Sequence, residues 1–407
     1  MSTARQLVYV ALVGSALLSL DCGDSAGPVV AKTITAVEGT GQSGPTGATL
    51  ATPFKVLVTG SNGKPYPGAT VTWTVPTGAA TPTPPTSATD ADGYSSTVVT
   101  LGGQIGPVVV QASVPGVAPV GFGATALDPC TYVVSYTLGA VVNGALATTD
   151  CITNNFYYTD FYGLTFGTQQ GLRITTTSTG FDTWLDVYRG NGDYLAFNDD
   201  IERGVITNSQ IDFIAAPGSY VLAPNSFDEF TTGPYTLSAV SRSQTVENCD
   251  LVWVTRGVTV TDSVTAGDCS DTDSTGTYYS DAVAIIALAG SVLTIAQRSA
   301  AVDAFLALYE VTDSGLVLVT ANDDSAGVGP NAHIVATVPD YAVYIVFMGT
   351  AGAGATGGYT VAISASATLA GTAAREVPEP LRVMPLPRMS KLRGVGTKPL
   401  PRSRPFR

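Results

Sequence analysis

The sequence predicts an all-β protein built from tandem β-sandwiches, and three observations support this. Its 407 residues include 44 Gly and 25 Pro, and only 13% are charged, which leaves little material for long surface helices. Apolar and polar residues alternate with period two, as in strands with one buried face. The segments that begin with Cys130…Cys151 and Cys249…Cys269 repeat the same landmarks at a nearly constant offset, which indicates a duplicated fold.

Residues 1–22 read as an export segment. The apolar run Leu7–Leu20 follows Arg5 and is too short to span a bilayer. It ends just before Cys22 and resembles the lipobox of bacterial lipoproteins, in which this cysteine becomes the acylated N-terminus. The preceding position is normally Gly, Ala or Ser and here is Asp21, so a plain cleaved secretory peptide is the alternative. Either outcome places the mature chain outside the cytoplasm, in the cell envelope, on the outer surface or secreted.

The other four cysteines are expected to form disulfides, because disulfides persist in oxidising compartments. Four cysteines allow three connectivities. A duplicated module had to be closed within itself, so the repeats favour Cys130 with Cys151 and Cys249 with Cys269. A disulfide closing a loop of this size stabilises by about 3 kcal/mol in the chain-entropy model.

Residues 23–32 form a short linker, and residues 33–127 form the first expected folded unit. Turn residues lie at Ser61–Gly68 and Thr89–Tyr94. The alternating strand residues are Phe54, Val56 and Val58; Ala69, Val71, Trp73 and Val75; and Val108, Val110, Ala112 and Val114. This pattern resembles the bacterial Ig-like domains of the invasin and intimin type. The resemblance implies a β-sandwich of about seven strands that spaces or presents other domains and sometimes serves in adhesion.

Residues 128–243 and 244–370 are the two repeats, each long enough to bury a core of its own. Their shared landmarks are Tyr158 to Asp160 and Tyr279 to Asp281, the strands Asp182–Tyr188 and Asp303–Tyr309, the turns Asn198–Asp200 and Asn322–Asp324, and the strands Gly233–Leu237 and Gly358–Val361. These features resemble the bacterial pre-peptidase C-terminal (PPC) domain. The resemblance implies a jelly-roll-like β-sandwich that accompanies secreted peptidases and occurs in surface proteins.

No catalytic residue is predicted. The chain contains one histidine, His333, which alternates with apolar residues as a strand-surface residue does. Ser-His-Asp, Cys-His and zinc sites need further partners around such a histidine. The sequence therefore predicts that the protein is not an enzyme, with a carboxylate-based metal-dependent hydrolase as a weaker third hypothesis.

Carboxylates at strand ends and turns supply the one metal hypothesis. They are Asp182, Asp186, Asp199 and Asp200 in the first repeat, and Asp303, Asp323 and Asp324 in the second. Calcium takes six to eight hard oxygen ligands of this kind. The alternative is that Asn-Asp-Asp only forms an Asx-type turn with solvated charges, since neither repeat has a dense ligand run.

Residues 371–407 form a basic, Pro-rich tail that is expected to be disordered. Nine Lys or Arg residues against Glu376 and Glu379 give it a net charge of +7, so the formal total of −13 leaves −20 for residues 1–370. The tail either docks to an anionic polymer such as lipopolysaccharide or acidic glycan, or is a tether. The acidic body argues against nucleic acid as the main partner.

These features together favour a non-enzymatic surface or secreted protein. Its β-sandwiches would present surfaces to an extracellular glycan, protein or matrix ligand, with a membrane lipid anchor at Cys22 if it is acylated. The alternative is an accessory or degenerate component of a secreted peptidase or hydrolase system, in which the same domains guide a substrate or partner.

Overall fold

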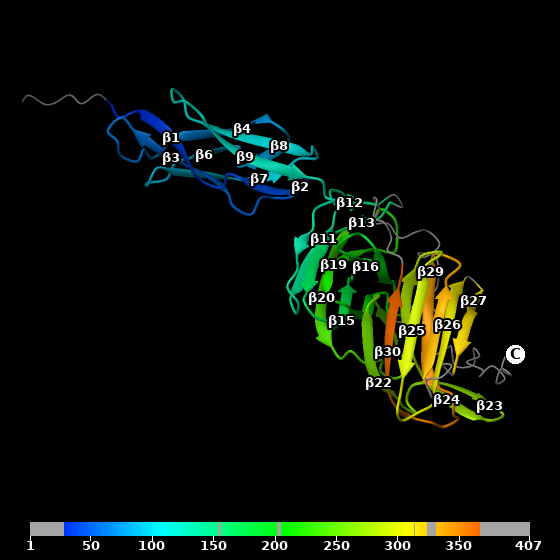
Figure 1. Cartoon of the computed structure of the whole chain (residues 1–407). Coiled ribbons are helices and arrows are strands. Elements are labelled where there is room, and N and C mark those ends of the chain that lie inside the picture. Colours follow the sequence, from blue (N-terminus) through cyan, green and yellow to red (C-terminus); the bar gives the residue numbers. More distant parts are fainter. Residues whose placement is uncertain (1–27, 154–155, 202–204, 313, 324–330, 367–407) are drawn as a thin grey trace, which may run out of the picture. The chain divides into compact units, whose positions relative to one another are not determined.

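The computed structural model describes residues 28–153, 156–201, 205–312, 314–323 and 331–366 (Figure 1). Every regular element in these residues is a β-strand, which confirms the predicted all-β class. Among the described residues no helix is long and apolar enough to cross a membrane. The chain divides into two compact units: most of the first 124 residues form one, and the residues from Thr125 onward form most of the other.

The first unit is a sandwich of two sheets. One sheet has the order β1 (Ala31–Glu38), β3 (Phe54–Gly60), β7 (Tyr94–Leu101), β5 (Ala80–Thr83), and the other β2 (Gln42–Pro45), β9 (Val120–Leu127), β8 (Gly106–Ser113), β4 (Thr70–Thr77), β6 (Thr86–Ala88). Buried and partly buried residues alternate along β3 and β8, as the sequence predicts. Phe122 of β9 stacks on Phe54 of β3 in the facing sheet, with ring centroids 4.8 Å apart, and so helps to close the core between the sheets. It also contacts Trp73 of β4 in its own sheet, with centroids 5.8 Å apart.

Repeat 1 also consists of two sheets. The first contains β10 (Val134–Ser135), β14 (Tyr162–Phe166), β19 (Gly218–Ser226), β16 (Thr183–Arg189) and β17 (Tyr194–Asn198) in that order, with the short strands β12 (Cys151–Ile152) and β13 (Tyr158–Thr159) extending beside β19. The second has the order β11 (Val141–Leu146), β20 (Gly233–Arg242), β15 (Gln170–Thr177), β18 (Ser209–Ala215).

Repeat 2 has closely the same topology. Its large sheet has the order β21 (Leu251–Val254), β24 (Gly276–Ala287), β29 (Ala342–Thr350), β26 (Ala304–Thr312), β27 (Gly315–Asn322), with β23 (Cys269–Asp273) beside β24. Its smaller sheet has the order β22 (Val258–Val264), β30 (Gly357–Ala365), β25 (Val292–Arg298), β28 (Ala332–Thr337). The strand orders correspond to those of repeat 1, except that the single strand β24 takes the places of both β13 and β14. The landmark pattern in the sequence therefore reflects a duplicated fold.

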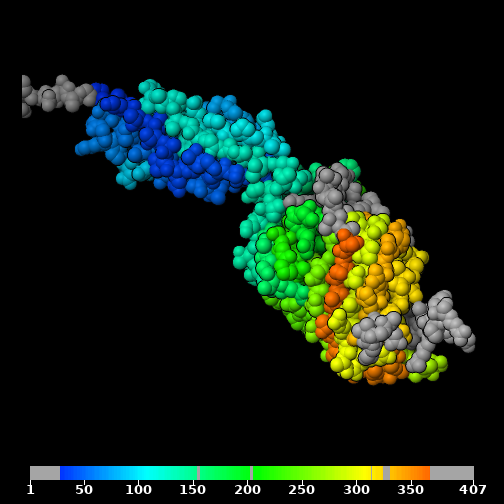
Figure 2. Space-filling view, in the orientation of Figure 1, coloured from blue at the N-terminus to red at the C-terminus, as the bar shows by residue number. Residues whose placement is uncertain are grey.

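The two repeats are joined into one body by a common sheet. Strand β18 of repeat 1 pairs in parallel with β21 of repeat 2, which places Phe213 opposite Trp253 and Ile214 opposite Val254. Strand β21 also pairs in parallel with β24, so a single ten-stranded sheet runs through both repeats. In the space-filling view the green strands of repeat 1 and the yellow and orange strands of repeat 2 form one continuous surface (Figure 2).

The large sheet of repeat 2 is buried on both faces. All nine residues of β29 are buried. Because side chains alternate across a strand, Val343, Ile345 and Phe347 belong to the core shared with repeat 1. Their neighbours Tyr344 and Val346 belong to the core under the smaller sheet of repeat 2. This sheet is therefore the central layer of the second unit.

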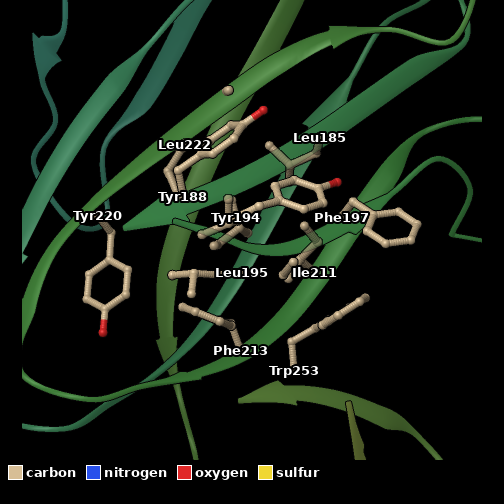
Figure 3. Packing of buried hydrophobic residues seen from close by; sticks show 14 of the residues in the cluster. Leu185, Tyr188, Tyr194, Leu195, Phe197, Ile211, Phe213, Tyr220, Leu222 and Trp253 are labelled. Carbon is tan, nitrogen blue, oxygen red and sulfur yellow. The ribbon is translucent and has the colours of Figure 1, made fainter. Parts of the chain in front are cut away.

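Aromatic side chains connect the repeats at the centre of the shared core (Figure 3). Phe197 at the end of β17 stacks on Trp184 and Tyr194, with centroids 5.5 and 5.9 Å apart. It also contacts Trp253 of repeat 2 at 5.4 Å. Since aromatic pairs of this kind each contribute roughly 0.5–1.5 kcal/mol beyond area burial, the cluster stabilises the union of the repeats as well as each sandwich.

An ion pair also joins the repeats. Asp193, in the turn between β16 and β17, accepts a 2.7 Å bond from Arg256 of repeat 2, and only 2% of Asp193 is exposed. Nearby, the backbone N–H of Ala216 donates to the Thr255 hydroxyl at 2.8 Å. Arg256 therefore neutralises a carboxylate that is buried where the two repeats meet.

We predict that Arg256→Ala lowers the free energy of unfolding by about 3–5 kcal/mol, the usual cost of leaving a buried charge without its partner. Urea denaturation measures this. Adding Asp193→Asn should restore much of the loss because it removes the stranded charge, whereas Arg298→Ala, at an exposed position on β25, should change little. An unchanged midpoint in Arg256→Ala would show that the ion pair does not contribute to the union.

Candidate functional site

Both disulfides form within their own repeats, as the repeat argument predicts. Cys130 bonds Cys151, and Cys249 bonds Cys269, each with Cα atoms 4.5 Å apart. The lipidation candidate Cys22 and the whole basic tail lie outside the described residues.

The seven aspartates of the calcium hypothesis have different environments. Asp186 lies in the core and accepts hydrogen bonds from Trp184 Nε1 at 2.5 Å, Tyr194 OH at 2.9 Å and Asn225 Nδ2 at 2.9 Å. It therefore organises the aromatic cluster from inside. A carboxylate committed to three buried donors does not project toward a solvent-borne ion.

Asp182, Asp199 and Asp200 do gather at one end of repeat 1. Burial and, after it, the negative charges of Asp200, Asp199 and Asp228 together raise the pKa of Asp182 to about 6. Asp199 Oδ1 also accepts the backbone N–H of the next residue, Asp200, at 2.9 Å.

In repeat 2, Asp303 and Asp323 take the equivalent places, and Asp324 lies outside the described residues. Within the described parts of the chain, no group of three or more His, Cys, Asp or Glu side chains is arranged to hold a metal ion. Calcium binding therefore stays a prediction.

The asparagines of the two Asn-Asp-Asp turns have a structural role. Asn198 Oδ1 accepts the backbone N–H of Gln210 at 3.1 Å, and Asn322 Oδ1 accepts that of His333 at 2.9 Å. Each asparagine thus fixes the start of the next strand. His333 itself is exposed on β28, as expected for a strand-surface residue.

A buried tyrosine–aspartate pair also recurs in both repeats. Tyr235 OH donates to Asp160 Oδ2 at 2.5 Å, and Tyr359 OH donates to Asp281 Oδ2 at 2.7 Å. Burial raises the pKa of both carboxyls and brings that of Asp281 to about 8. The aromatic-Asp and Gly-x-Tyr landmarks of the sequence are thus the two halves of one contact, and the raised pKa favours the protonated form of Asp281 at neutral pH.

A patch of exposed apolar side chains lies at one end of repeat 1 and was not predicted from the sequence. We call the described loop residues that form it, 153, 156–157, 178–182, 199–201, 205–208 and 226–232, the loop end of repeat 1. Backbone bonds hold the loops together: Phe227 N–H donates to Asp182 O at 3.0 Å, and Phe230 N–H donates to Phe156 O at 2.9 Å. The exposed members are Phe156, Ile201, Val205, Ile206, Phe227 and Phe230, which include every exposed phenylalanine of the described residues.

Two of these phenylalanines have left-handed backbones. The φ angles of Phe156 and Phe230 are 66° and 53°, and their rings stack with centroids 5.1 Å apart. Half or more of each residue is exposed, 50% and 55%. A left-handed backbone costs an L-residue roughly 1–2 kcal/mol, and such strain tends to persist at functional sites.

The second repeat provides an internal comparison for Phe230. Gly354 N–H donates to Thr277 O at 2.7 Å, the same bond that Phe230 makes to Phe156, and Gly354 has φ 69°. Repeat 2 therefore places glycine where the backbone turns left-handed, and repeat 1 places an exposed phenylalanine there. The loops have equal length, but Phe227–Thr232 carries aromatic and acidic side chains whereas Ala351–Thr356 carries small ones.

The loop end of repeat 1 is also strongly acidic. Its described residues include no Lys or Arg; Glu202 and Arg203, whose charges cancel, lie outside them. The described carboxylates are Asp182, Asp199, Asp200, Asp228 and Glu229. The exposed rings can stack on apolar groups of a ligand, and the neighbouring carboxylates can accept hydrogen bonds from its hydroxyl or cationic groups. Exposed apolar patches of this kind mark binding surfaces.

The solved structures described next are distantly similar to this chain. No protein-family model matches the chain, and no curated protein matches it. The PPC domain of a collagenase from Bacillus anthracis is 20% identical, over 26% of this chain and 94% of that one, with a TM-score of 0.22. The D0-D1 domain of intimin is 14% identical, over 55% and 94%, with a TM-score of 0.21.

Invasin, a bacterial integrin-binding protein, is 15% identical, over 77% of this chain and 54% of its own, with a TM-score of 0.20. The similar solved structures thus include both domain types that the sequence resembles. Identities and scores this low carry no argument about what the chain binds.

We predict that Asp281→Asn flattens the pH dependence of stability. A carboxyl whose pKa rises from 3.8 unfolded to about 8 folded takes up a proton on folding, so stability is greatest below pH 4 and falls as pH rises toward 8. Asparagine stays neutral and still accepts the Tyr359 hydroxyl. Urea melts between pH 5 and 8.5 should show the variant gaining on the native chain as pH rises, and Glu229→Gln, at an exposed site, should not. Parallel curves for Asp281→Asn and the native chain would contradict a protonated Asp281.

Proposed function

We propose that this chain is an exported, non-enzymatic protein of the cell surface, cell envelope or medium, and that the loop end of repeat 1 binds its extracellular ligand. The ligand is a glycan, protein or matrix component. The observation that carries the proposal is Phe230, an exposed and conformationally strained phenylalanine at a position where the sister repeat has Gly354.

The rigidity of the loop end supports this role. Its loops leave the ends of paired strands and are tied to one another: Thr183 N–H donates to Thr207 O at 3.0 Å, and Ser178 N–H to Asn208 Oδ1 at 3.0 Å. Phe227 lies over the buried Trp184, with centroids 6.2 Å apart. Aromatic side chains that are already ordered lose little conformational entropy on binding, which favours affinity.

Binding is favoured over catalysis by the chemistry of these loops. Their described residues offer aromatic rings, carboxylates and hydroxyls, and the single histidine of the chain lies in β28 of repeat 2. A nucleophile with its base and an orienting group is not assembled there. The surface can accept hydrogen bonds from a ligand and shield its apolar groups from water.

We predict that the mature N-terminus is a diacylated Cys22. The apolar run that ends in the lipobox-like segment motivates this expectation. Mass spectrometry of the protein from its native membrane fraction should find the acylated cysteine, and Cys22→Ser should release the chain into the soluble fraction. An unmodified N-terminus at another residue would contradict the lipid anchor but would still agree with export.

We predict that Phe230→Gly combined with Phe156→Ala abolishes ligand binding while the chain stays folded. Gly354 shows that the backbone accepts glycine at this position, so relief of strain offsets the lost ring stacking and stability should change by no more than about 1 kcal/mol. Glycan and matrix-protein arrays probed with the mature chain and the variant measure the effect.

The matched control removes two exposed apolar side chains elsewhere. Val317→Ala with Leu318→Ala, on β27 of repeat 2, should leave every array signal unchanged. Array signals that survive the phenylalanine substitutions but fall in this control would place the binding surface on repeat 2 and refute the proposal.

A further inference from the structure

We propose that the loop end of repeat 1 binds the basic C-terminal tail, residues 371–407, of the same chain. This inference rests on the proposed function, because it assigns an internal occupant to the same surface. The tail would then compete with the extracellular ligand and regulate access to it.

Charge complementarity is the first argument. The described residues of the loop end carry five carboxylates and no cation, and the tail carries nine cations against two carboxylates. Opposite charges held on one molecule attract at a high effective concentration, since the partner is tethered.

Side-chain chemistry is the second argument. The sequence Pro-Leu-Pro-Arg occurs twice in the tail, at residues 385–388 and 399–402. Pro-rich segments dock on exposed aromatic rings, because their extended backbone is already ordered and their rings are apolar. The arginine that ends each motif has the planar, fork-shaped donor set that pairs with carboxylates. The loop end offers both counterparts, the stacked Phe156 and Phe230 beside Asp228 and Glu229.

The length of the tail is sufficient for the contact. Strand β30 ends at Ala365, and the two motifs begin 20 and 34 residues later. Fully extended, these stretches span up to about 65 and 110 Å. The longest strand of the second unit, β24, has 12 residues and is about 40 Å long. The second motif can therefore extend well past the length of either repeat.

The sister repeat shows why the tail should select repeat 1. The corresponding loop Ala351–Thr356 has neither an aromatic nor a charged side chain. A tail attracted only by the general negative charge of the body would not distinguish the repeats, whereas one that needs Phe156 and Phe230 would.

A labelled peptide tests the proposal. The probe is a synthetic peptide of residues 371–407, and its binding is followed by fluorescence anisotropy to the mature chain and to a chain ending at Ala370, which keeps every described strand. The peptide should bind the shortened chain and bind the full chain about tenfold more weakly or worse, because the native tail already occupies the surface.

Variants locate the contact. Phe156→Ala with Phe230→Gly in the shortened chain should weaken peptide binding about tenfold or more, and Val317→Ala with Leu318→Ala should not. Replacing Arg388 and Arg402 of the peptide by glutamine should also weaken binding, and so should added salt. No binding to the shortened chain, or equal binding to the phenylalanine variant, would overturn the proposal.

Two further measurements separate the outcomes. Sedimentation of the full chain at increasing concentration should show a constant mass; concentration-dependent dimers that the deletion abolishes would mean that tails bind between copies and would overturn the assignment to the same chain. Arrays on the shortened chain test the parent proposal independently. Signals that depend on Phe156 and Phe230, together with no peptide binding, would retain the proposed function and refute its occupation by the tail.

Discussion

The parallel pairing of β18 with β21 is the contact on which the second unit depends. It continues the smaller sheet of repeat 1 into the large sheet of repeat 2. It also brings the β16–β17 hairpin against the face of the large sheet that is turned toward repeat 1. That face must then be apolar. Ala284, Ile345 and Phe347 satisfy this requirement, and Trp253 on β21 supplies the aromatic contact to Phe197. An independent sandwich would have presented the same face to water and would have needed polar residues there.

Period-two alternation made the strands of the first unit predictable, because β3 and β8 each bury one face. Period-two alternation could not predict that the two repeats share a sheet. Strand β29 has a continuous apolar run, Ala342–Met348, which is typical of a strand buried on both faces. The run indicates that a second layer exists but does not name its partner. The partner strand β21 has only four residues, so no pattern in the sequence could reveal that it pairs with β18 as well as β24.

The residues of the candidate site also fall into those that the sequence predicted and those that it did not. Sequence landmarks that recur in both repeats proved to be structural: Asp281 is bonded to Tyr359, Asn322 fixes the next strand, and the cysteines close their own repeats. Duplication preserves what the fold requires in each copy, so recurrence selects structural residues. A function that only one copy acquired is expected at positions where the two repeats have loops of equal length but different side chains. The contrast between Phe230 and Gly354 was present in the sequence, but it became informative only once the structure gave both positions a left-handed backbone.

The energetics of Phe230 explain how such a difference can persist. The left-handed backbones of Phe230 and Phe156 each cost roughly 1–2 kcal/mol, and the stacking of the two rings offsets about 0.5–1.5 kcal/mol of the sum. The net cost is small against the many buried contacts of a unit whose central sheet is covered on both faces. A strained, exposed aromatic pair therefore needs a rigid scaffold, and the two joined repeats provide it. Asp186 accepts a hydrogen bond from Trp184 within the shared core, and Trp184 contacts Phe227 at the loop end. Packing between the repeats thus extends by direct contact to the surface that we assign to binding.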